Sequence, residues 1–511
     1  MKEFDSPLIG LVDLVDLNAK YAGDQMAFAI GDLAVNWRTF AQRTARIARA
    51  IERVGVKPDD VVAMVLHNRM EFIETMIAVL RAGAVLAPIS PDLTAASIGR
   101  MVEDAGARLL VAEQLTCRAA HEGAACVRTR MLVDGSIDGW DSYQTSCEPA
   151  DDQFPARPCT REARFNIMYS SGTTGAPKGI VHTHGARGDL IAMFIAHMKL
   201  DAGSVSLVTT PLHTNGSWCV LLPTIGIGGA TVVLPKFNVP AFLDACRRFR
   251  PTYTLLVPTQ LQMILTDPQF DPEALGCFRK VMCSGAPLPH AMKQALAEHL
   301  GEALIEIYGT TEGVAVARPP RVPAGKSRAV GLPMAGYDVR ILGESAIENP
   351  PGKVGEIVGY GPSMMKRYHN QPQLTAEVMW LDERGRTYLR TGDLGFLDES
   401  GYLYLAGRKK DMIISGGQNV YAVDIEQVLL AHRDVAEAAV FAVPHPKWGE
   451  SPAAAVVAKA NRTIDPDLLR QWANEQLAKH QRLLAVKVYE SLPRNAMGKV
   501  VKRELAIDLS G

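Results

Sequence analysis

One short segment combines small, hydroxylic and basic side chains in a spacing that suits a polyphosphate ligand. Residues 169–184 read YSSGTTGAPKGIVHTH, with a lysine between two expected strands. Backbone N–H groups of a glycine- and serine-rich loop can close on phosphate oxygens, while hydroxyl and ammonium groups add donors. The segment therefore predicts a polyphosphate site. Its contributors would be Ser170, Ser171, Gly172, Thr173, Thr174, Gly175 and Lys178.

This loop differs from a Walker A P-loop at both diagnostic positions. A P-loop has glycine before its lysine and a magnesium-binding Ser or Thr after it. Here Pro177 precedes Lys178 and Gly179 follows it. The Walker interpretation is therefore excluded.

Five segments, taken in order, resemble those of the adenylate-forming superfamily, which includes acyl-CoA synthetases, aryl-CoA ligases, luciferases and adenylation domains of peptide synthetases. The first is the loop at 169–184. The others are YGTTEG at 308–313, TGDLG at 391–395, GRKKDMIISGGQNVYAVDIE at 407–426 and PRNAMGKVVKREL at 493–505. Because they occur in the superfamily's order over a stretch of about two-thirds of the chain, the chain is identified as a member, an AMP-dependent acid-CoA ligase.

The resemblance implies a nucleotide site with one wall of small residues and one aromatic ring. Its members beyond the loop would be Gly285, Ala286, Pro287, Tyr308, Gly309, Thr310, Thr311, Asp393 and Arg408. Glu312 offers a hard oxygen, which suits Mg²⁺. The Asp393 carboxylate suits two ribose hydroxyls, and Arg408 would add a cation near the sugar and phosphate.

The same resemblance implies that Lys499 is the adenylation lysine. Its long stem could bring a charge to the carboxylate and the α-phosphate as negative charge develops there. Thr311, Glu312 and Lys178 complete the implied catalytic set. In the implied reaction the acid attacks the α-phosphate of ATP, pyrophosphate leaves, and the acyl-adenylate passes its acyl group to coenzyme A.

Two half-reactions require two surfaces of one small domain. The resemblance implies a rotation at a hinge at Lys410, after which Gly416 and Gly417 would line a tunnel for the pantetheine thiol. The expected domains are residues 1–406, an adenylation body with the ATP and acyl sites, and residues 407–511, a mobile C-terminal domain.

The acyl pocket is less sharply defined. Residues 209–218, TTPLHTNGSW, resemble the superfamily's proline-leucine-aromatic-histidine segment but are one residue short, so His213 fills either the aromatic gate position or the histidine position. Mostly neutral side chains favour an apolar acid, whether aromatic, alicyclic or medium-chain aliphatic. The expected lining is His213, Thr214, Asn215, Trp218, Thr259, Ser284, Gly313 and Ala315.

Hydrophobic periodicity indicates the elements that must position these residues. Periods near 3.6 alternate with short β-rich runs, which is typical of helices and parallel strands. We expect an α/β fold: a large N-terminal multi-subdomain α/β body with ligand loops at strand ends, and a small mobile α+β C-terminal domain. Helices are expected at 40–54, 71–80, 240–249, 290–300, 423–431 and 466–480, and strands at 84–89, 253–257, 304–308, 436–443 and 453–458. The uncharged residues 218–235 contain prolines and glycines, so we expect a buried helix, a turn and a strand there.

Composition and charge limit the classes of binding partner that we expect. With 54 basic and 55 acidic residues dispersed along 511 positions, the chain has no electrostatic footprint for nucleic acid, and its length predicts two or more domains. The eight cysteines include no C-x-x-C pair, and no secretory signal is evident, so we expect free thiols in the cytoplasm. The expected partner is a small carboxylic acid; no integral membrane segment is expected, and a homodimer is left open.

Three alternatives remain. A stand-alone adenylating enzyme could load a carrier protein in place of coenzyme A, and a luciferase-like oxygenase would use the same motifs. An inactive nucleotide-binding homologue is least favoured, since the chain retains Lys178, Glu312, Asp393, Arg408 and Lys499.

Overall fold

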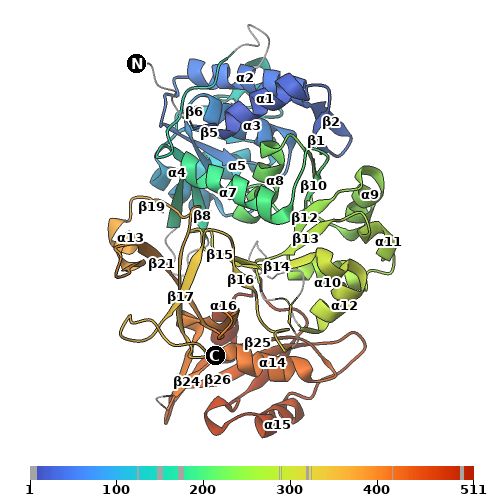
Figure 1. Ribbon diagram of the computed structural model, residues 1–511, viewed down its shortest axis with the longest axis vertical. Helices are drawn as coiled ribbons and strands as arrows, with labels where there is room; N and C mark the ends of the chain where they lie inside the picture. The colour runs from blue at the N-terminus through green and yellow to red at the C-terminus, as the bar shows by residue number, and fades with distance from the viewer. Residues whose placement is uncertain are drawn as a thin grey trace. The chain divides into compact units, whose positions relative to one another are not determined.

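The computed structural model of the chain forms two compact units (Figure 1). The first comprises Met1–Arg321, Pro333–Tyr337 and Tyr360–Thr387, and the second comprises Val322–Leu332, Asp338–Gly359 and Tyr388–Gly511. The mixed α/β class, with a large amino-terminal body and a separate carboxy-terminal domain, is thereby confirmed. The structure describes residues 8–123, 126–146, 154–170, 178–286, 288, 290–317, 322–323, 325–416, 418–494 and 500–510.

The first unit contains a largely parallel sheet in the order β15-β14-β13-β12-β10-β11-β1-β2, with β16 beside β15. Strands β1 and β10 to β14 are parallel, whereas β2 and β15 at the ends run antiparallel to their neighbours. The strands are β1 (Met26–Ile30), β2 (Leu33–Asn36), β10 (Val205–Val208), β11 (Ala230–Val233), β12 (Tyr253–Leu256), β13 (Lys280–Cys283), β14 (Leu304–Gly309), β15 (Ala315–Ala317) and β16 (Leu332–Pro333). Its helical segments are α1 (Leu11–Tyr21), α7 (His184–Met198), α8 (Asn215–Gly226), α9 (Val239–Phe249), α10 (Pro258–Thr266), α11 (Pro272–Leu275), α12 (His290–Leu300) and η1 (Gly301–Ala303).

A second sheet of the same unit has the order β19-β9-β8-β4-β3-β5-β6-β7. Its strands are β3 (Val61–Val65), β4 (Val85–Pro88), β5 (Ala107–Ala112), β6 (Thr129–Leu132), β7 (Asp141–Ser142), β8 (Arg164–Ser170), β9 (Lys178–Thr183) and β19 (Arg367–Tyr368). The helices around it are α2 (Trp37–Arg53), α3 (Met70–Arg81), α4 (Ala95–Ala105), α5 (Gln114–Gly123) and α6 (Tyr143–Ser146); α13 (Pro372–Glu377) and β20 (Met379–Leu381) follow β19. One apolar core joins the two sheets, since Phe28 of β1, Phe165 of β8 and Trp218 of α8 belong to the same buried cluster.

Local signals explain several of these elements. The Asn36 side chain caps α2 by accepting from Thr39 N at 2.8 Å. The helix expected at 40–54 has one face formed by Phe40, Thr44, Ile47, Ile51 and Val54; the first four are buried, and Val54 is half-buried. The prediction for residues 218–235 is confirmed, because α8 is followed by a turn and β11. No helix in the described part of the chain is long and apolar enough to cross a bilayer. The described cysteines, which exclude Cys147, are all free thiols.

The second unit contains two smaller sheets. The first includes β17 (Asp338–Leu342), β18 (Gly355–Tyr360), β21 (Thr387–Leu397) and β22 (Leu403–Arg408). The other has the order β24-β23-β26-β25, with β27 beside β26. Its elements are β23 (Ile413–Ser415), β24 (Gln418–Val420), α14 (Ala422–Ala431), β25 (Val435–His445), β26 (Gly449–Ala458), α15 (Pro466–Gln476), β27 (Val486–Tyr489) and α16 (Lys502–Ser510), with short 3₁₀ turns η2 (Lys409–Asp411) and η3 (Lys479–Gln481). The predicted boundary after residue 406 remains a prediction.

The end of α15 corrects one expectation. A helix was expected over 466–480, but α15 ends at Gln476 and Leu477 has an extended backbone. The Asn474 side chain holds the chain reversal, since its Oδ1 accepts from Leu483 N at 2.7 Å and its Nδ2 donates to Leu483 O at 3.1 Å. Apolar periodicity cannot reveal such a side-chain clamp, so the helix was predicted too long.

Candidate active site

The predicted acyl-pocket residues follow neighbouring parallel strands of the first sheet. Strands β14, β13, β12 and β10 are adjacent, so their carboxyl ends meet at one edge, where open α/β sheets bind ligands. After β10 come His213, Thr214, Asn215 and Trp218; after β12, Thr259 in α10; after β13, Ser284; and after β14, Gly313 and Ala315. The structure therefore brings these loops together, while their contact with an acyl group remains a prediction.

The expected adenine loop and tyrosine lie at the ends of two paired strands. Gly285 and Ala286 follow β13, and Tyr308 and Gly309 end β14. A buried ion pair that sequence reasoning missed braces this loop: Lys293 Nζ lies 2.6 Å from Glu306 Oε2, and Glu306 Oε1 accepts from Leu288 N at 3.5 Å. Pro287 lies outside the described residues.

The turn between β14 and β15 fixes the positions of Thr310, Thr311 and Glu312. Gly313 N donates to Thr310 O at 3.1 Å, and Met365 N donates to Glu312 O at 2.7 Å. Gly313 has φ +120°, and a Cβ there would stand 2.5 Å from Met364 Cα. Glycine is therefore required at this position both by its backbone conformation and by the close approach of another backbone.

The Gly313 requirement can be measured. Gly313→Ala is expected to lower the free energy of unfolding by about 2–5 kcal/mol, because a left-handed backbone and a backbone clash both disfavour a side chain. Gly106→Ala is the matched control: φ there is +62°, but nothing lies within 4 Å of its Cβ position, so a loss of only about 1–2 kcal/mol is expected. Equal losses in urea unfolding would refute the steric part of this explanation.

Glu312 is held by a tyrosine from a distant segment. Tyr368 Oη donates to Glu312 Oε1 at 2.8 Å, and Lys178 Nζ lies 5.8 Å from the Tyr368 ring centroid. Burial and the neighbouring Glu312 carboxylate raise the pKa of Tyr368, so the phenol keeps its proton. No cluster of three or more His, Cys, Asp or Glu suited to a metal occurs in the described ranges. One carboxylate fits a Mg²⁺ ion held mainly through phosphate oxygens and water.

Lys178 is the first residue of β9, and Ser170 is the last of β8. The two are register partners in the antiparallel β8–β9 pair, so the predicted phosphate loop is flanked by two paired strands, and Lys178 opens the second strand instead of preceding it. Ser171, Gly172, Thr173, Thr174 and Gly175 lie in residues 171–177, outside the described part of the chain.

Trp218 is fully buried. Its Nε1 donates to Leu212 O at 2.8 Å, the Phe165 ring meets it edge-on at 5.9 Å, and the Arg187 guanidinium lies 4.9 Å from its ring centroid. The Trp218 ring thus packs inside the core in this structure, and its contact with an acyl group remains a prediction.

The segment that carries His213 is held by a neighbouring loop. Asn68 Nδ2 donates to Thr210 O at 3.1 Å and to Leu234 O at 3.0 Å, and Asn68 Oδ1 accepts from Leu212 N at 2.7 Å. Burial lowers the pKa of His213 to about 4, so this side chain is neutral at physiological pH.

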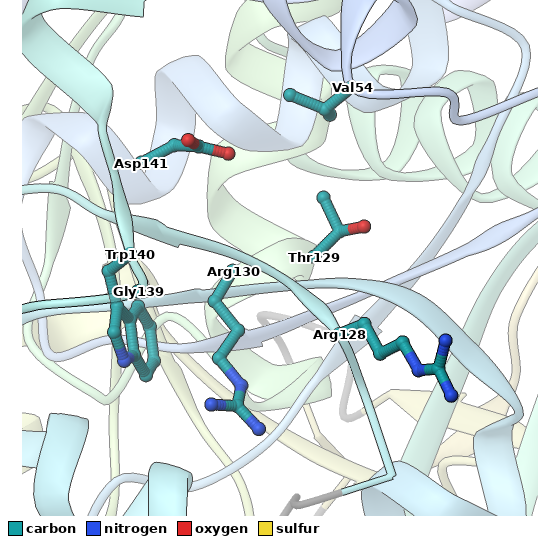
Figure 2. Close-up of a pocket in the computed structure, with 7 residues that line it drawn as sticks. All are labelled: Val54, Arg128, Thr129, Arg130, Gly139, Trp140 and Asp141. Carbon is teal, nitrogen blue, oxygen red and sulfur yellow. The ribbon is translucent and has the colours of Figure 1, made fainter.

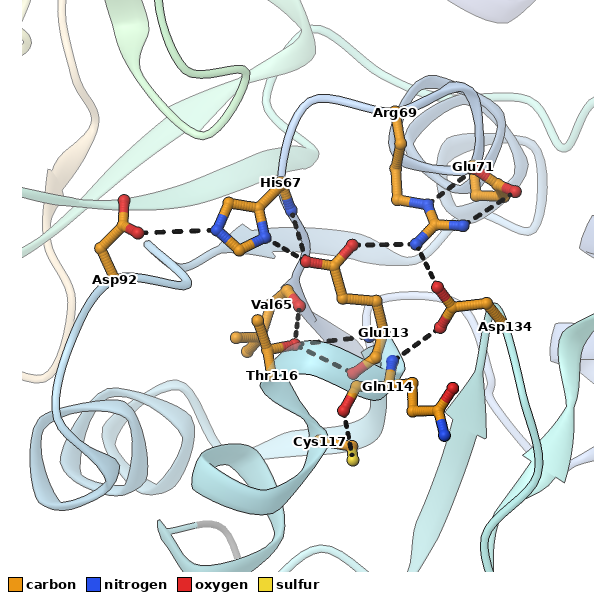
Figure 3. Close-up of polar contacts among 10 residues, drawn as sticks. All are labelled: Val65, His67, Arg69, Glu71, Asp92, Glu113, Gln114, Thr116, Cys117 and Asp134. Carbon is orange, nitrogen blue, oxygen red and sulfur yellow. Dashed lines mark hydrogen bonds and ion pairs between the residues drawn. The ribbon is translucent and has the colours of Figure 1, made fainter. Parts of the chain in front are cut away.

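A charged cluster lies at the carboxyl ends of strands in the second sheet (Figure 3). His67 contacts Glu113 through Nδ1 and lies 3.5 Å from Asp92 Oδ1 through Nε2. Arg69 Nη1 lies 2.9 Å from a Glu113 oxygen and 2.8 Å from an Asp134 oxygen. Since these charges pair with one another, the cluster braces the loop that carries Asn68.

The ribose-binding candidates belong to the second unit. Asp393 and Arg408 are register partners in β21 and β22, and Arg408 Nε lies 2.9 Å from Asp393 Oδ1. The Asp393 N–H group donates to Thr391 Oγ1 at 3.1 Å. The carboxylate expected to meet the ribose is thus already paired with the cation expected beside it.

The predicted hinge and tunnel residues follow this hairpin. Lys410 lies in η2, and Gly416 lies in the tight turn between β23 and β24 with φ +59°. Gly416 N donates to Trp448 O at 2.9 Å, and a Cβ on Gly416 would stand 2.9 Å from the Trp448 ring. Trp448, which the sequence did not single out, therefore flanks the predicted thiol tunnel. Gly417 is not among the described residues.

The segment that carries Lys499 lies partly outside the described residues, and so does Lys499 itself. Its neighbours are anchored: Arg494 and Val500 form a bridge, and Val501 N donates to Pro493 O at 2.8 Å. Lys502 Nζ lies 2.6 Å from Glu426 Oε1 in α14.

A surface pocket of about 540 Å³ lies elsewhere in the first unit (Figure 2). Its lining is Val54, Arg128, Thr129, Arg130, Gly139, Trp140 and Asp141. Arg128 to Arg130 stand at the amino end of β6, whereas the predicted site residues follow the carboxyl ends of strands. This pocket is therefore separate from the predicted site.

Comparison with known proteins confirms the family that the motifs predicted. Residues 15–369 match the family described as AMP-binding enzyme, and residues 424–499 match AMP-binding enzyme C-terminal domain. The chain is 34% identical over 481 residues to a feruloyl-CoA synthase of an Amycolatopsis species, covering 93% of the chain and 94% of that protein. It is 30% identical over 507 residues to a fatty acid–[acyl-carrier-protein] ligase of Streptomyces coeruleorubidus, covering 97% and 95%. An o-succinylbenzoate CoA synthetase of Bacillus subtilis, solved with its acyl-adenylate intermediate, has a TM-score of 0.85 at 26% identity over 96% of the chain and 97% of that structure.

Proposed function

The chain belongs to the AMP-binding enzyme family, and we propose that it is an AMP-forming acid-CoA ligase. It activates a carboxylic acid with ATP as an acyl-adenylate and then forms the thioester of coenzyme A, with AMP and pyrophosphate as the other products. The observation that carries the proposal is the convergence of the predicted loops after β10, β12, β13 and β14 on one sheet edge. There the turn after β14 presents Glu312, with Tyr368 and Lys178 beside it.

In the first half-reaction, a carboxylate oxygen of the acid attacks the α-phosphorus. The bond from that phosphorus to the bridging oxygen breaks, and pyrophosphate leaves. Lys178 and Lys499 supply positive charge where oxygens become more negative. Glu312 would hold Mg²⁺, which neutralises phosphate charge when bound. Tyr368 keeps the Glu312 carboxylate in one orientation through its hydrogen bond.

In the second half-reaction, the thiol sulfur attacks the acyl carbonyl carbon and AMP leaves with the bonding electron pair. Gly416 and Gly417 leave room for the pantetheine arm, and the Trp448 ring beside Gly416 offers it an apolar wall. Lys499 is needed in the first half-reaction and the Gly416 turn in the second. The proposal therefore includes a rotation at Lys410 between the two half-reactions.

The proposed substrate is an apolar, aromatic acid. The feruloyl-CoA synthase similarity supports this class. So does His213, because burial keeps it neutral and it therefore offers no positive charge to a second carboxylate. The cytoplasmic location and the homodimer considered from the sequence remain predictions.

A carrier protein is the alternative acyl acceptor. The similarity to a fatty acid–[acyl-carrier-protein] ligase is the observation that favours this alternative. Both acceptors present the same phosphopantetheine thiol, so the adenylation residues do not distinguish them. The two acceptors differ in the part beyond this thiol arm, so the protein surface that contacts that part would distinguish them.

The test is acid-dependent pyrophosphate release with ATP, Mg²⁺ and pools of carboxylic acids. Release that coenzyme A accelerates, with a thioester detected by mass, is expected. Pyrophosphate and acyl-adenylate without a thioester, until a phosphopantetheinylated carrier is added, would establish the alternative. ADP release in place of AMP would contradict both.

A further inference from the structure

Arg187 is a buried cation next to the acyl segment. Its side chain is 1% exposed, and no carboxylate among the described residues forms an ion pair with it. Its Nε donates to Asn166 Oδ1 at 3.0 Å, and its Nη1 donates to Asn215 Oδ1 at 2.8 Å. Burial lowers the pKa of Arg187 to about 10, so the guanidinium stays charged at neutral pH. Burying an unpaired charge is costly, which calls for an explanation of this arginine.

A third contact of Arg187 determines where His182 carries its proton. Arg187 Nη2 lies 3.2 Å from His182 Nδ1, and arginine N–H groups can only donate. Nδ1 must therefore accept, which leaves the proton of the neutral ring on Nε2. Burial, with the Arg187 charge, lowers the pKa of His182 well below its usual value, so the ring is neutral.

The His182 Nε2–H group then reaches the predicted phosphate and metal turn. Nε2 lies 2.9 Å from Thr311 O, the carbonyl of the peptide that precedes Glu312. A protonated Nε2 donates to this carbonyl and restrains the peptide. Arg187 is thus connected through one neutral ring to the backbone that carries Glu312.

At its other end, Arg187 determines the orientation of the Asn215 amide. Since the guanidinium can only donate, it must meet Asn215 Oδ1, and the amide N–H₂ group is turned away from it. Asn215 is half-buried at the start of α8, in the segment predicted to meet the acyl group. One guanidinium therefore contacts both a residue of the acyl segment and the histidine that holds the metal turn.

We propose that Arg187 is a positioning residue of adenylation, which holds the Thr311–Glu312 peptide through the Nε2–H tautomer of His182 and orients the Asn215 amide toward the acid. Its catalytic consequence rests on the proposed function. The His182 tautomer and the affinity for Mg·ATP do not, because both are measured without turnover. Removing a residue that holds a metal-binding residue in place typically lowers metal affinity or activity 10- to 100-fold.

The decisive comparison is Arg187→Met against Asn215→Ala. Arg187→Met is expected to weaken Mg·ATP binding, measured by calorimetry, by about 10- to 100-fold and to raise the KM for the acid. Asn215→Ala removes only the bond on the acid side, so it is expected to raise the acid KM without changing Mg·ATP affinity. Histidine ¹⁵N NMR is expected to show the Nε2–H tautomer of His182 in the wild type and a tautomer mixture in Arg187→Met.

The pH dependence gives a readout that a purely structural role would not produce. Arg187 is the charged group identified as shifting the pKa of His182; Asn166 and the Thr311 carbonyl are its other polar contacts. Without Arg187, the pKa of His182 rises toward its usual value. His182 then becomes protonated at a higher pH, so the acidic limb of kcat/KM for ATP is expected to move to higher pH in Arg187→Met. Arg187→Lys keeps the charge and is expected to restore the limb.

Unchanged Mg·ATP affinity in Arg187→Met, together with an unchanged His182 tautomer, would overturn the proposal. If Arg187→Met does not fold, Arg187→Gln serves in its place, because it removes the charge and its shorter amide cannot make all three hydrogen bonds; wild-type Mg·ATP affinity and a wild-type acidic limb there would likewise overturn the proposal. A wild-type protein that binds Mg·ATP but releases no pyrophosphate would refute the proposed function, while the binding and NMR results would still decide the role of Arg187.

Discussion

Lys499→Ala is expected to lower the rate of acyl-adenylate formation by about 10²–10³-fold, while supplied acyl-adenylate is still converted to the thioester at nearly the wild-type rate. The size of the loss is that of removing one electrostatic donor aimed at developing charge. The selectivity follows because only the first half-reaction places new negative charge on the α-phosphate and the carboxylate. Pyrophosphate release and thioester formation from synthetic acyl-adenylate, each in single turnover, measure the two steps separately.

Lys502→Ala is the matched control for Lys499. It removes a lysine from the same carboxy-terminal segment, but Lys502 is paired with Glu426 at 2.6 Å and so has a structural partner. We expect it to change both half-reactions by similar, small factors. Equal loss of both half-reactions in Lys499→Ala would contradict the division of labour between Lys499 and the Gly416 turn.

Glu312→Gln is expected to lower acyl-adenylate formation by about 10²–10³-fold and to raise the Mg²⁺ concentration needed for half-maximal rate. The amide keeps an oxygen that can accept from Tyr368 Oη, so the local structure should survive. What is lost is the negative charge that suits a hard cation. Pyrophosphate release as a function of Mg²⁺ at saturating ATP measures both effects.

Tyr368→Phe separates charge from orientation. It removes the hydrogen bond at 2.8 Å but leaves the Glu312 carboxylate in place. A loss of about 10-fold is expected, at the lower end of the roughly 1.5–3 kcal/mol that a hydrogen bond to a charged group contributes, because the carboxylate itself is kept. If Tyr368→Phe were as damaging as Glu312→Gln, the carboxylate charge would not be the feature that matters.

The sequence was sufficient where local pattern decides structure. Four of the five residues on the predicted face of α2 are buried, and residues 218–235 form the expected helix, turn and strand, because periodicity and turn residues act over short distances. It was insufficient at α15, where Asn474 binds Leu483 across a chain reversal. Side-chain clamps of this kind leave no trace in apolar periodicity.

The motifs predicted which residues form the nucleotide side of the site, but not the residues that hold them in place. Tyr368 reaches Glu312 because β19 pairs with β9, although the two residues are 56 positions apart. Arg187 was not singled out from the sequence, since nothing in the local pattern around a single arginine shows that it is buried. Contacts between segments far apart in sequence decide both cases, and one sequence cannot reveal them.

ATP–pyrophosphate exchange without coenzyme A tests the central claim most directly. Labelled pyrophosphate should enter ATP only when the cognate acid is present, because the acyl-adenylate forms reversibly before any thiol is needed. Acid-dependent exchange without coenzyme A is the predicted result. Thioester formation for the same acid, with no exchange and no acyl-adenylate detectable on the enzyme, would contradict a two-step reaction through acyl-AMP.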